Sequence, residues 1–228
     1  MEIRMVLPEY ERIANANRSP RASAPVNIPV IEESAATGEV ALLYEHFRSH
    51  FGRPDVPGIL KCFATHPPLL RHMMDLSEDL IFSDGCLSRR HKEMIATLVS
   101  ELNACPYCAD SHGYFLRVHG GSAELLDAIQ RCDLSSSVLA DCERALLVFS
   151  RKVNISSHEI GRQDVELLYQ AGWSAMQVAE TVHITGLFST FNRVANAFGV
   201  ESQGLLSLFD AQTGNPRSDE ATLQRTSH

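Results

Sequence analysis

The stretch RRHKEMIATLVSELNACPYCADSHGYFLRVHGG, residues 89–121, predicts two consecutive helices joined by a tight turn. Ser88 is the expected N-cap of the first helix, which we expect to run to Ala104. Pro106 fits the first position of the second helix, and Gly120 and Gly121 are typical of a helix end. The apolar stripe of the first helix repeats at helical spacing and consists of Met94, Ile95, Leu98, Val99 and Leu102.

The rest of the chain follows the same helical period. Further helices are expected at 39–50, 69–82, 122–131, 137–153, 163–171 and 174–199. Ser174 and Gln177 form a capping box for the last of these. Because no β-type alternation of any length interrupts the pattern, the predicted fold class is all-α. We divide the chain into an extended, proline-containing N-terminal arm (1–31), a helical domain (32–209) and a polar C-terminal tail (210–228).

Composition narrows the function classes. The chain has 228 residues, of which 44% are hydrophobic and 21% charged, as in ordinary globular proteins. A net charge of −8 without a basic cluster argues against a nucleic-acid partner. No segment reaches the ~18 apolar residues of a membrane span, and the N-terminus does not resemble a signal peptide. We therefore expect a cytoplasmic protein without a membrane partner.

Two cysteines and a histidine are clustered at the start of the second helix. With Cys105 at the N-cap, Cys108 lies in the first turn and His112 follows one turn later on the same face. Backbone N–H groups and a nearby histidine both stabilise a thiolate. The helix start favours Cys105 as the activated thiol, whereas the neighbouring His112 favours Cys108.

Three interpretations of this cluster remain open. In a reducing compartment a close cysteine pair is more often catalytic or metal-binding than a structural disulfide, and we favour a redox dithiol. A structural zinc site would use Cys105, Cys108 and His112, with His119 as fourth ligand. The third interpretation is two buried small side chains beside a core histidine. We expect no cofactor and no bound metal, and we assign Cys62, Cys86, Cys132 and Cys142 to packing.

Glu93 is the only charged residue on the small-residue face of the first helix. If that face is buried, the low dielectric is expected to raise the pKa of Glu93 toward a value useful in proton transfer. If the face is exposed, Glu93 is simply solvated.

The spacing from Glu93 through Cys105-Pro106-Tyr107-Cys108 to His112 resembles the signature of the alkylhydroperoxidase D-like proteins in the carboxymuconolactone decarboxylase superfamily. The later stretch LLYQAGWSAMQVAETVHITGLFSTFNRVANAFGV, residues 167–200, is similar to the closing helices of the peroxidase-related branch.

The resemblance implies an all-helical protein that assembles into trimers or hexamers and reduces organic hydroperoxides with a cysteine pair. It implies that Cys108 is the peroxidatic nucleophile, that Cys105 resolves it, and that Glu93 and His112 form a proton relay. Tyr107 stands where well-studied members carry a histidine. A thiol or dithiol reductant of unknown identity is the implied second partner.

Straight helices would leave Glu93 and His112 at different heights, so this relay is expected to need a tilt, a kink or a bridging water. Glu101 is the reserve candidate for the carboxylate. Two alternative functions remain: a non-catalytic zinc-binding or scaffold protein on the same fold, and a decarboxylase or isomerase of the carboxymuconolactone type in which the cysteines are incidental.

Overall fold

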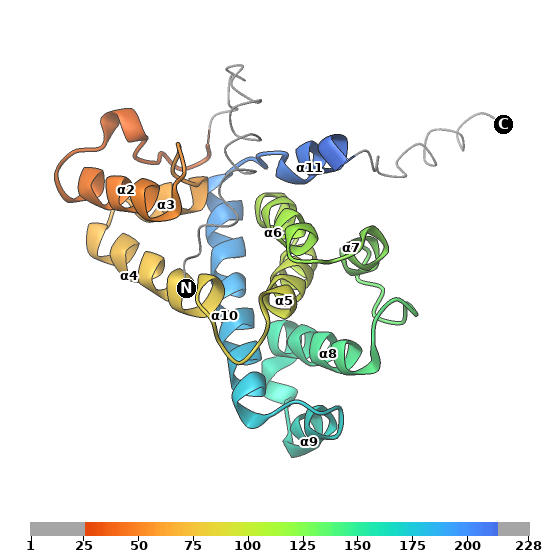
Figure 1. The fold of residues 1–228 in the computed structure, drawn as a ribbon. Coiled ribbons are helices and arrows are strands. Elements are labelled where there is room, and N and C mark those ends of the chain that lie inside the picture. Colours follow the sequence, from red (N-terminus) through yellow and green to blue (C-terminus); the bar gives the residue numbers. More distant parts are fainter. Residues whose placement is uncertain (1–25, 214–228) are drawn as a thin grey trace.

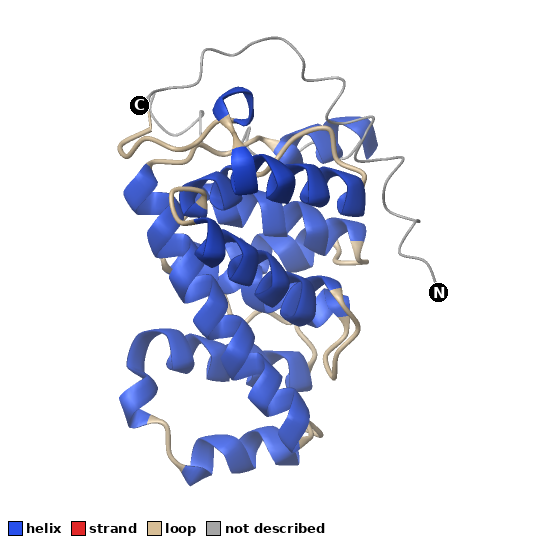
Figure 2. Cartoon of the chain, turned by 90° about the vertical axis from the view of Figure 1, so that its left-hand side faces the viewer, coloured by secondary structure: helices blue, strands red, loops and turns tan. Residues whose placement is uncertain are grey.

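The computed structural model describes residues 26–213, and the regular structure within that range is helical (Figures 1 and 2). This confirms the predicted all-α class. A short 3-10 turn (Glu33–Ala35) precedes the first α-helix, and a second one (Ser157–Glu159) follows the helix that ends at Ser156. The α-helices are α2 (Gly38–Phe51), α3 (Gly58–Phe63), α4 (Pro67–Ser77), α5 (Arg89–Leu102), α6 (Pro106–Val118), α7 (Ala123–Gln130), α8 (Asp141–Ser156), α9 (Arg162–Gln170), α10 (Ala175–Phe198) and α11 (Leu205–Thr213).

Helices α5 and α6 form the predicted hairpin. The Ser88 hydroxyl accepts the backbone N–H of His91 and caps α5. Cys105 is the N-cap of α6 and Pro106 its first residue, as the sequence predicts. Between the helices Ala104 has a φ of +47°, a left-handed conformation that is costly for a residue other than glycine. This turn lets the chain reverse within a few residues and places both cysteines at the start of α6.

Helix α10 runs through the middle of the molecule beside α5, α3 and α8 (Figure 1). Its N-terminus carries the predicted capping box, in which the Ser174 hydroxyl accepts the Gln177 backbone N–H. The face of α10 toward α5 and α8 is polar in part, and its buried Thr185 shares a 2.9 Å hydrogen bond with Ser150 of α8. The same face carries Asn192 toward the cysteines.

Some elements differ from the sequence prediction. The helix expected at 69–82 ends at Ser77 and continues as a π-helical turn (Glu78–Phe82). Helix α3 was not predicted because six residues are too few to show a period. Helix α11 was not predicted either: its first two N–H groups, of Leu205 and Leu206, bind the carboxylate of Asp110 at 2.9 and 3.1 Å. That cap comes from α6 and has no local sequence signal.

The ends of the chain are described only in part. The predicted arm (1–31) is described from residue 26, where the backbone N–H of Asn27 donates to the Phe198 carbonyl. The predicted tail (210–228) is described only to Thr213, the last residue of α11. The remaining residues of both segments lie outside the described range. Within residues 26–213 no helix combines the length and the apolar character required to cross a membrane.

Candidate active site

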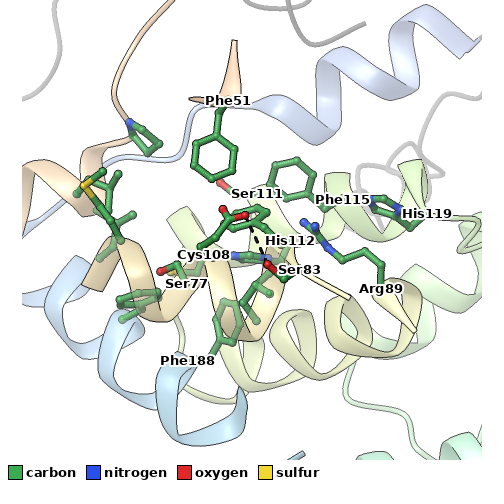
Figure 3. A pocket seen from close by; sticks show the side chains of 18 of the residues that line it. Phe51, Ser77, Ser83, Arg89, Cys108, Ser111, His112, Phe115, His119 and Phe188 are labelled. Carbon is green, nitrogen blue, oxygen red and sulfur yellow. Dashed lines mark hydrogen bonds between the residues drawn. The ribbon is translucent and has the colours of Figure 1, made fainter. Parts of the chain in front are cut away.

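A pocket of about 660 Å³ is lined by residues of α2, α3, α4, the π-helical turn, α5, α6, α10 and α11. Six phenylalanines from these elements make its walls predominantly apolar: Phe47, Phe51, Phe82, Phe115, Phe188 and Phe191. Figure 3 shows Cys108, Ser111 and His112 beside one another in this pocket, with Arg89 and His119 to one side and Ser77 to the other. The volume lies in the range of sites that hold small organic molecules.

Both cysteines of the cluster are free thiols, and they differ in access to this pocket. Cys105 is 1% exposed and does not line the pocket, whereas Cys108 is 3% exposed and does. Cys108 is therefore the sulfur that a molecule in the pocket can reach. Cys105 lies behind it, within hydrogen-bonding reach.

The two thiols share their protons unequally. A hydrogen bond from the Cys108 thiol lowers the pKa of Cys105 to about 7, and the backbone N–H groups of Cys108 and Tyr107 add to this against the effect of burial. The pKa of Cys108 is raised, first because it donates to Cys105 and second because it is buried. Near neutral pH the resting negative charge of the pair therefore resides on Cys105, as the helix-start argument suggests, while pocket access belongs to Cys108.

Asn192 of α10 is the side chain that connects this pair to the rest of the fold. It is fully buried, and its side-chain amide hydrogen-bonds Ser100 Oγ and the Asn103 amide at 3.0 Å each. The amide also hydrogen-bonds the sulfurs and lowers the pKa of both Cys105 and Cys108. The sequence shows Asn192 only as a polar residue in an apolar helix, which does not reveal that it contacts the dithiol.

Glu93 is completely buried and joins two side chains of the site. Its carboxylate accepts a hydrogen bond from Arg89 Nε at 2.5 Å and lies 2.7 Å from His112 Nδ1. Burial alone raises the pKa of Glu93, but the charges and hydrogen bonds of Arg89 and His112 outweigh it and the net pKa is lowered. The expectation of a raised pKa is therefore wrong: Glu93 stays ionised and fixes His112 rather than releasing a proton itself.

Of the tilt, kink or bridging water expected for the relay, the bridging water is not needed. Glu93 and His112 touch directly, with His112 Nδ1 2.7 Å from the carboxylate. The reach of the two side chains adds to the rise of the backbone and makes this contact possible. Glu101, the reserve carboxylate, does not line the pocket, and its charge acts instead on Cys132.

His112 is held on two sides. Its ring packs edge-on against Phe188 with a centroid distance of 4.4 Å, while Nδ1 faces Glu93. Because His112 follows Cys108 by four residues in α6, the imidazole and the thiol are neighbours on one helix face, and both line the pocket. Within the described residues no hydrogen bond of Nε2 is found, so this ring atom is available to a molecule in the pocket.

Arg89 is a site residue that the sequence reasoning missed. Its guanidinium lies over the rings of Phe82 at 4.7 Å and Phe115 at 5.5 Å, and its side chain is 22% exposed. The i,i+4 spacing of Arg89 and Glu93 was the available signal, because an ion pair at that spacing is common on helices.

The zinc interpretation finds no ligand group. Within residues 26–213, no three histidine, cysteine or carboxylate side chains come close enough together to hold a metal ion. His119 lines the pocket beside Arg89, and burial together with the Arg89 charge lowers its pKa. Tyr107 is buried with its hydroxyl accepting the Ile59 backbone N–H at 3.3 Å, so it anchors α3 to α6.

Comparison with known proteins finds a matching family and similar solved structures. Residues 67–149, which include both cysteines, Glu93 and His112, match the model of the carboxymuconolactone decarboxylase family. A crystal structure of an uncharacterized peroxidase-related protein with an alkylhydroperoxidase AhpD core, from Ralstonia eutropha, is 27% identical and superposes with a TM-score of 0.72. The match covers 81% of this chain and 96% of that one.

Two further matches are weaker. A protein described as uncharacterized protein 4 in the cox locus of Paracoccus denitrificans is 35% identical over 51 residues, which is 22% of this chain and 46% of that protein. The chain thus matches less than half the length of that relative. The debrominase Bmp8 in complex with 2,3,4-tribromopyrrole has a TM-score of 0.66 at 16% identity, covering 83% of this chain and 98% of that one, which shows a common fold alone.

Proposed function

We propose that this chain, an alkylhydroperoxidase D-like protein of the carboxymuconolactone decarboxylase superfamily, reduces organic hydroperoxides through Cys108 and Cys105. One observation carries the proposal. The Cys108 thiol lines a mainly apolar pocket, with Cys105 behind it and the Glu93–His112 hydrogen bond one helical turn away. This set provides a nucleophile, a resolving thiol and a proton carrier for a peroxide bound in the pocket.

In the first step the proton of Cys108 moves to the Cys105 thiolate along their hydrogen bond. The Cys108 thiolate then attacks the terminal peroxide oxygen, the O–O bond breaks, and the alkoxide leaves. Protonated His112 donates its proton to the alkoxide, which departs as an alcohol. Cys108 is oxidised to the sulfenic acid and the peroxide is reduced.

In the second step Cys105 loses its proton to His112 and attacks the Cys108 sulfur. An S–S bond forms, the S–O bond breaks, and His112 protonates the hydroxide to water. Ionised Glu93 keeps the imidazole oriented and stabilises its charged form in both steps. An external dithiol, whose identity is open, would return the pair to the reduced state.

A single-turnover assay tests the proposal. The fully reduced protein is mixed with an organic hydroperoxide, and free thiols are counted before and after. We expect wild type to lose two thiols per chain, Cys105→Ser to accumulate a sulfenic acid that a 1,3-diketone probe traps, and Cys108→Ser to show no reaction. The control is Cys86→Ser, because Cys86 is exposed and lines the same pocket, yet we expect this variant to react like wild type.

Unreactive wild-type thiols would overturn the proposal, and sulfenic acid trapped at Cys105 instead of Cys108 would reverse the two roles. Turnover of a lactone or carboxylate substrate by a Cys105→Ser, Cys108→Ser double variant would favour the decarboxylase alternative. A content near one zinc per chain in the purified protein would favour the zinc alternative.

We also propose that the chain forms a homo-oligomer, a trimer or a hexamer. Helices α9 and α10 expose large apolar side chains, among them Leu167, Tyr169, Met176 and Val182, as expected of a surface that a second copy covers. Light scattering should give a mass of three or six chains of 25.2 kDa. A monomeric mass at micromolar concentration would contradict this.

A further inference from the structure

Arg89 carries hydrogen-bond donors for which residues 26–213 provide no acceptor. Its Nε is bound to Glu93, but within the described residues no hydrogen bond or ion pair of its two terminal nitrogens is found. A guanidinium presents a planar fork of donors, and the outer edge of the fork fits a carboxylate with two parallel hydrogen bonds. Arg89 lines the pocket, so its terminal nitrogens are available to a ligand there.

The orientation of this guanidinium is fixed. The rings of Phe82 and Phe115 lie against it, and the bond to Glu93 holds one edge. A cation held in this way loses little conformational freedom when an anion binds, so more of the interaction contributes to affinity. Figure 3 shows Arg89 at one side of the pocket, beside Phe115 and His119.

The other charged residues of the pocket favour a ligand orientation in which a carboxylate points toward Arg89. Glu78 and Asp84 also line the pocket, and Glu78 lies 3.4 Å from His50. The other arginine of the lining, Arg53, lies 3.6 Å from Asp55, which offsets its charge. A carboxylate near these acidic side chains would be repelled, whereas at Arg89 it would find two donors. The remaining walls are largely aromatic and aliphatic and suit a hydrocarbon chain.

We propose that Arg89 binds the carboxylate of an amphipathic substrate, so that the pocket selects hydroperoxides of long-chain carboxylic acids over neutral hydroperoxides. Selectivity in turnover rests on the proposed peroxidase function. Binding of a carboxylate at Arg89 does not depend on that function. Glu93 connects Arg89 to His112, which follows Cys108 by one turn, so the head group and the reacting sulfur are separated by several bond lengths. The peroxide must therefore be carried on the chain, away from the carboxylate.

The test compares an unsaturated fatty-acid hydroperoxide with its methyl ester, which differs only in the charge of the head group. The measured quantity is the ratio of single-turnover rate constants for acid and ester at subsaturating concentration. Because both substrates use the same Glu93–His112 pair, any effect of an Arg89 substitution on that pair cancels in the ratio. We expect a ratio of about 10 in wild type and about 1 in Arg89→Leu, with Arg89→Lys in between.

The matched control is Arg53→Leu. Arg53 also lines the pocket but already lies 3.6 Å from Asp55, so this variant should keep the wild-type ratio. A wild-type ratio near 1, or a ratio that Arg89→Leu leaves unchanged, would overturn the specificity.

A second measurement separates this proposal from the proposed function. Calorimetric titration of Cys108→Ser with the unoxidised fatty acid and its methyl ester reports binding without any reaction. We expect about tenfold tighter binding of the acid, lost on adding Arg89→Leu. If wild-type thiols do not react with any hydroperoxide but this difference holds, the peroxidase proposal fails and the anion site remains. If the thiols react and the difference is absent, the reverse is true.

Discussion

Lys92 and Glu93 are neighbours in α5, both are buried charges, and their surroundings differ in one respect. The Lys92 ammonium binds Glu180 at 2.9 Å and the Ser83 carbonyl at 3.1 Å, and Glu180 accepts the Leu87 backbone N–H at 2.7 Å. The Lys92–Glu180 pair thus binds backbone groups at both ends of the segment from Ser83 to Leu87. Glu93 is held by Arg89 and His112, and both of these line the pocket with hydrogen-bonding atoms to spare.

The difference shows how two buried charges on one helix can be told apart. A network in which the charged groups bind one another and backbone groups fixes a loop, here the segment from Ser83 to Leu87 at the edge of the pocket. A network that ends in unused donors at a cavity is available to a ligand or to proton transfer. We therefore propose that Lys92 contributes to stability and that Glu93 contributes to the proposed reaction.

The largest effect should come from Lys92→Met. Removing one partner leaves Glu180 partly buried without its counter-ion, so the free energy of unfolding should fall by about 3–5 kcal/mol. Urea denaturation measures this, and single-turnover activity per folded molecule should stay within about twofold of wild type. Adding Glu180→Gln should recover part of the loss, because no uncompensated charge is then left. If the free energy of unfolding falls by less than about 1 kcal/mol, the Lys92–Glu180 pair contributes no more than an exposed ion pair, and the prediction is wrong.

Glu93→Gln should have the opposite effect to Lys92→Met, with a large loss of activity and a smaller loss of stability. The amide retains the shape of the carboxylate but cannot stabilise a charged imidazole, so we expect the single-turnover rate with an organic hydroperoxide to fall by about 100-fold. The stability loss should be smaller than that of Lys92→Met. Glu101→Gln is the control, expected to keep the wild-type rate since Glu101 does not line the pocket. An undiminished rate in Glu93→Gln would remove Glu93 from the mechanism.

Gly85→Ala tests the Lys92–Glu180 ion pair by a steric change in a neighbouring residue. A Cβ at this position would overlap the Glu180 carboxylate and come within 2.8 Å of Lys92 Nζ, so the ion pair would have to shift. We expect a loss of about 1–3 kcal/mol in thermal or urea unfolding. In contrast, Gly186→Ala in α10 meets no atom within 4 Å and should stabilise by about 0.5–1 kcal/mol. Equal losses in both variants would contradict the role of the loop contact.

The smallest expected effect concerns the dithiol. Because the pKa of Cys105 is lowered to about 7, its thiolate population rises as the pH increases through 7 and declines in acid. Because Cys105 is shielded from reagents, the ultraviolet absorbance of the thiolate should report this transition, taken as the difference between wild type and Cys105→Ser. Cys62→Ser is the control and should leave the transition unchanged, since burial raises the pKa of Cys62 to about 12. Asn192→Leu removes a hydrogen bond that lowers the pKa of Cys105, so the transition should move to higher pH. An unchanged transition would show that Asn192 does not act on the dithiol.

These contrasts also explain how far the sequence could lead. Ser88, Pro106 and Ser174 were predicted correctly as helix-start residues because a cap depends on residues within one turn. The cysteine cluster and its neighbour His112 share one helix and were equally local. The sign of the Glu93 pKa shift was not predicted, because burial was considered without the cation one turn earlier.

The remaining features depend on contacts between distant segments. Asn192 reaches the cysteines only because α10 packs on α5, and the cap that Asp110 provides for α11 spans the chain in the same way. The pocket itself is lined by residues from α2 to α11, and no single window of sequence contains it. Such features follow from tertiary packing, which local periodicity does not encode.

The burial of the cysteine pair has a consequence for the order of events in turnover. Cys105 is shielded and Cys108 meets the outside through the pocket that would also hold the hydroperoxide. An alcohol product and an incoming dithiol would then compete for the same space, so each must leave before the other enters. Steady-state kinetics should follow a double-displacement pattern, with parallel lines in double-reciprocal plots. Excess hydroperoxide should slow turnover by occupying the oxidised form of the protein.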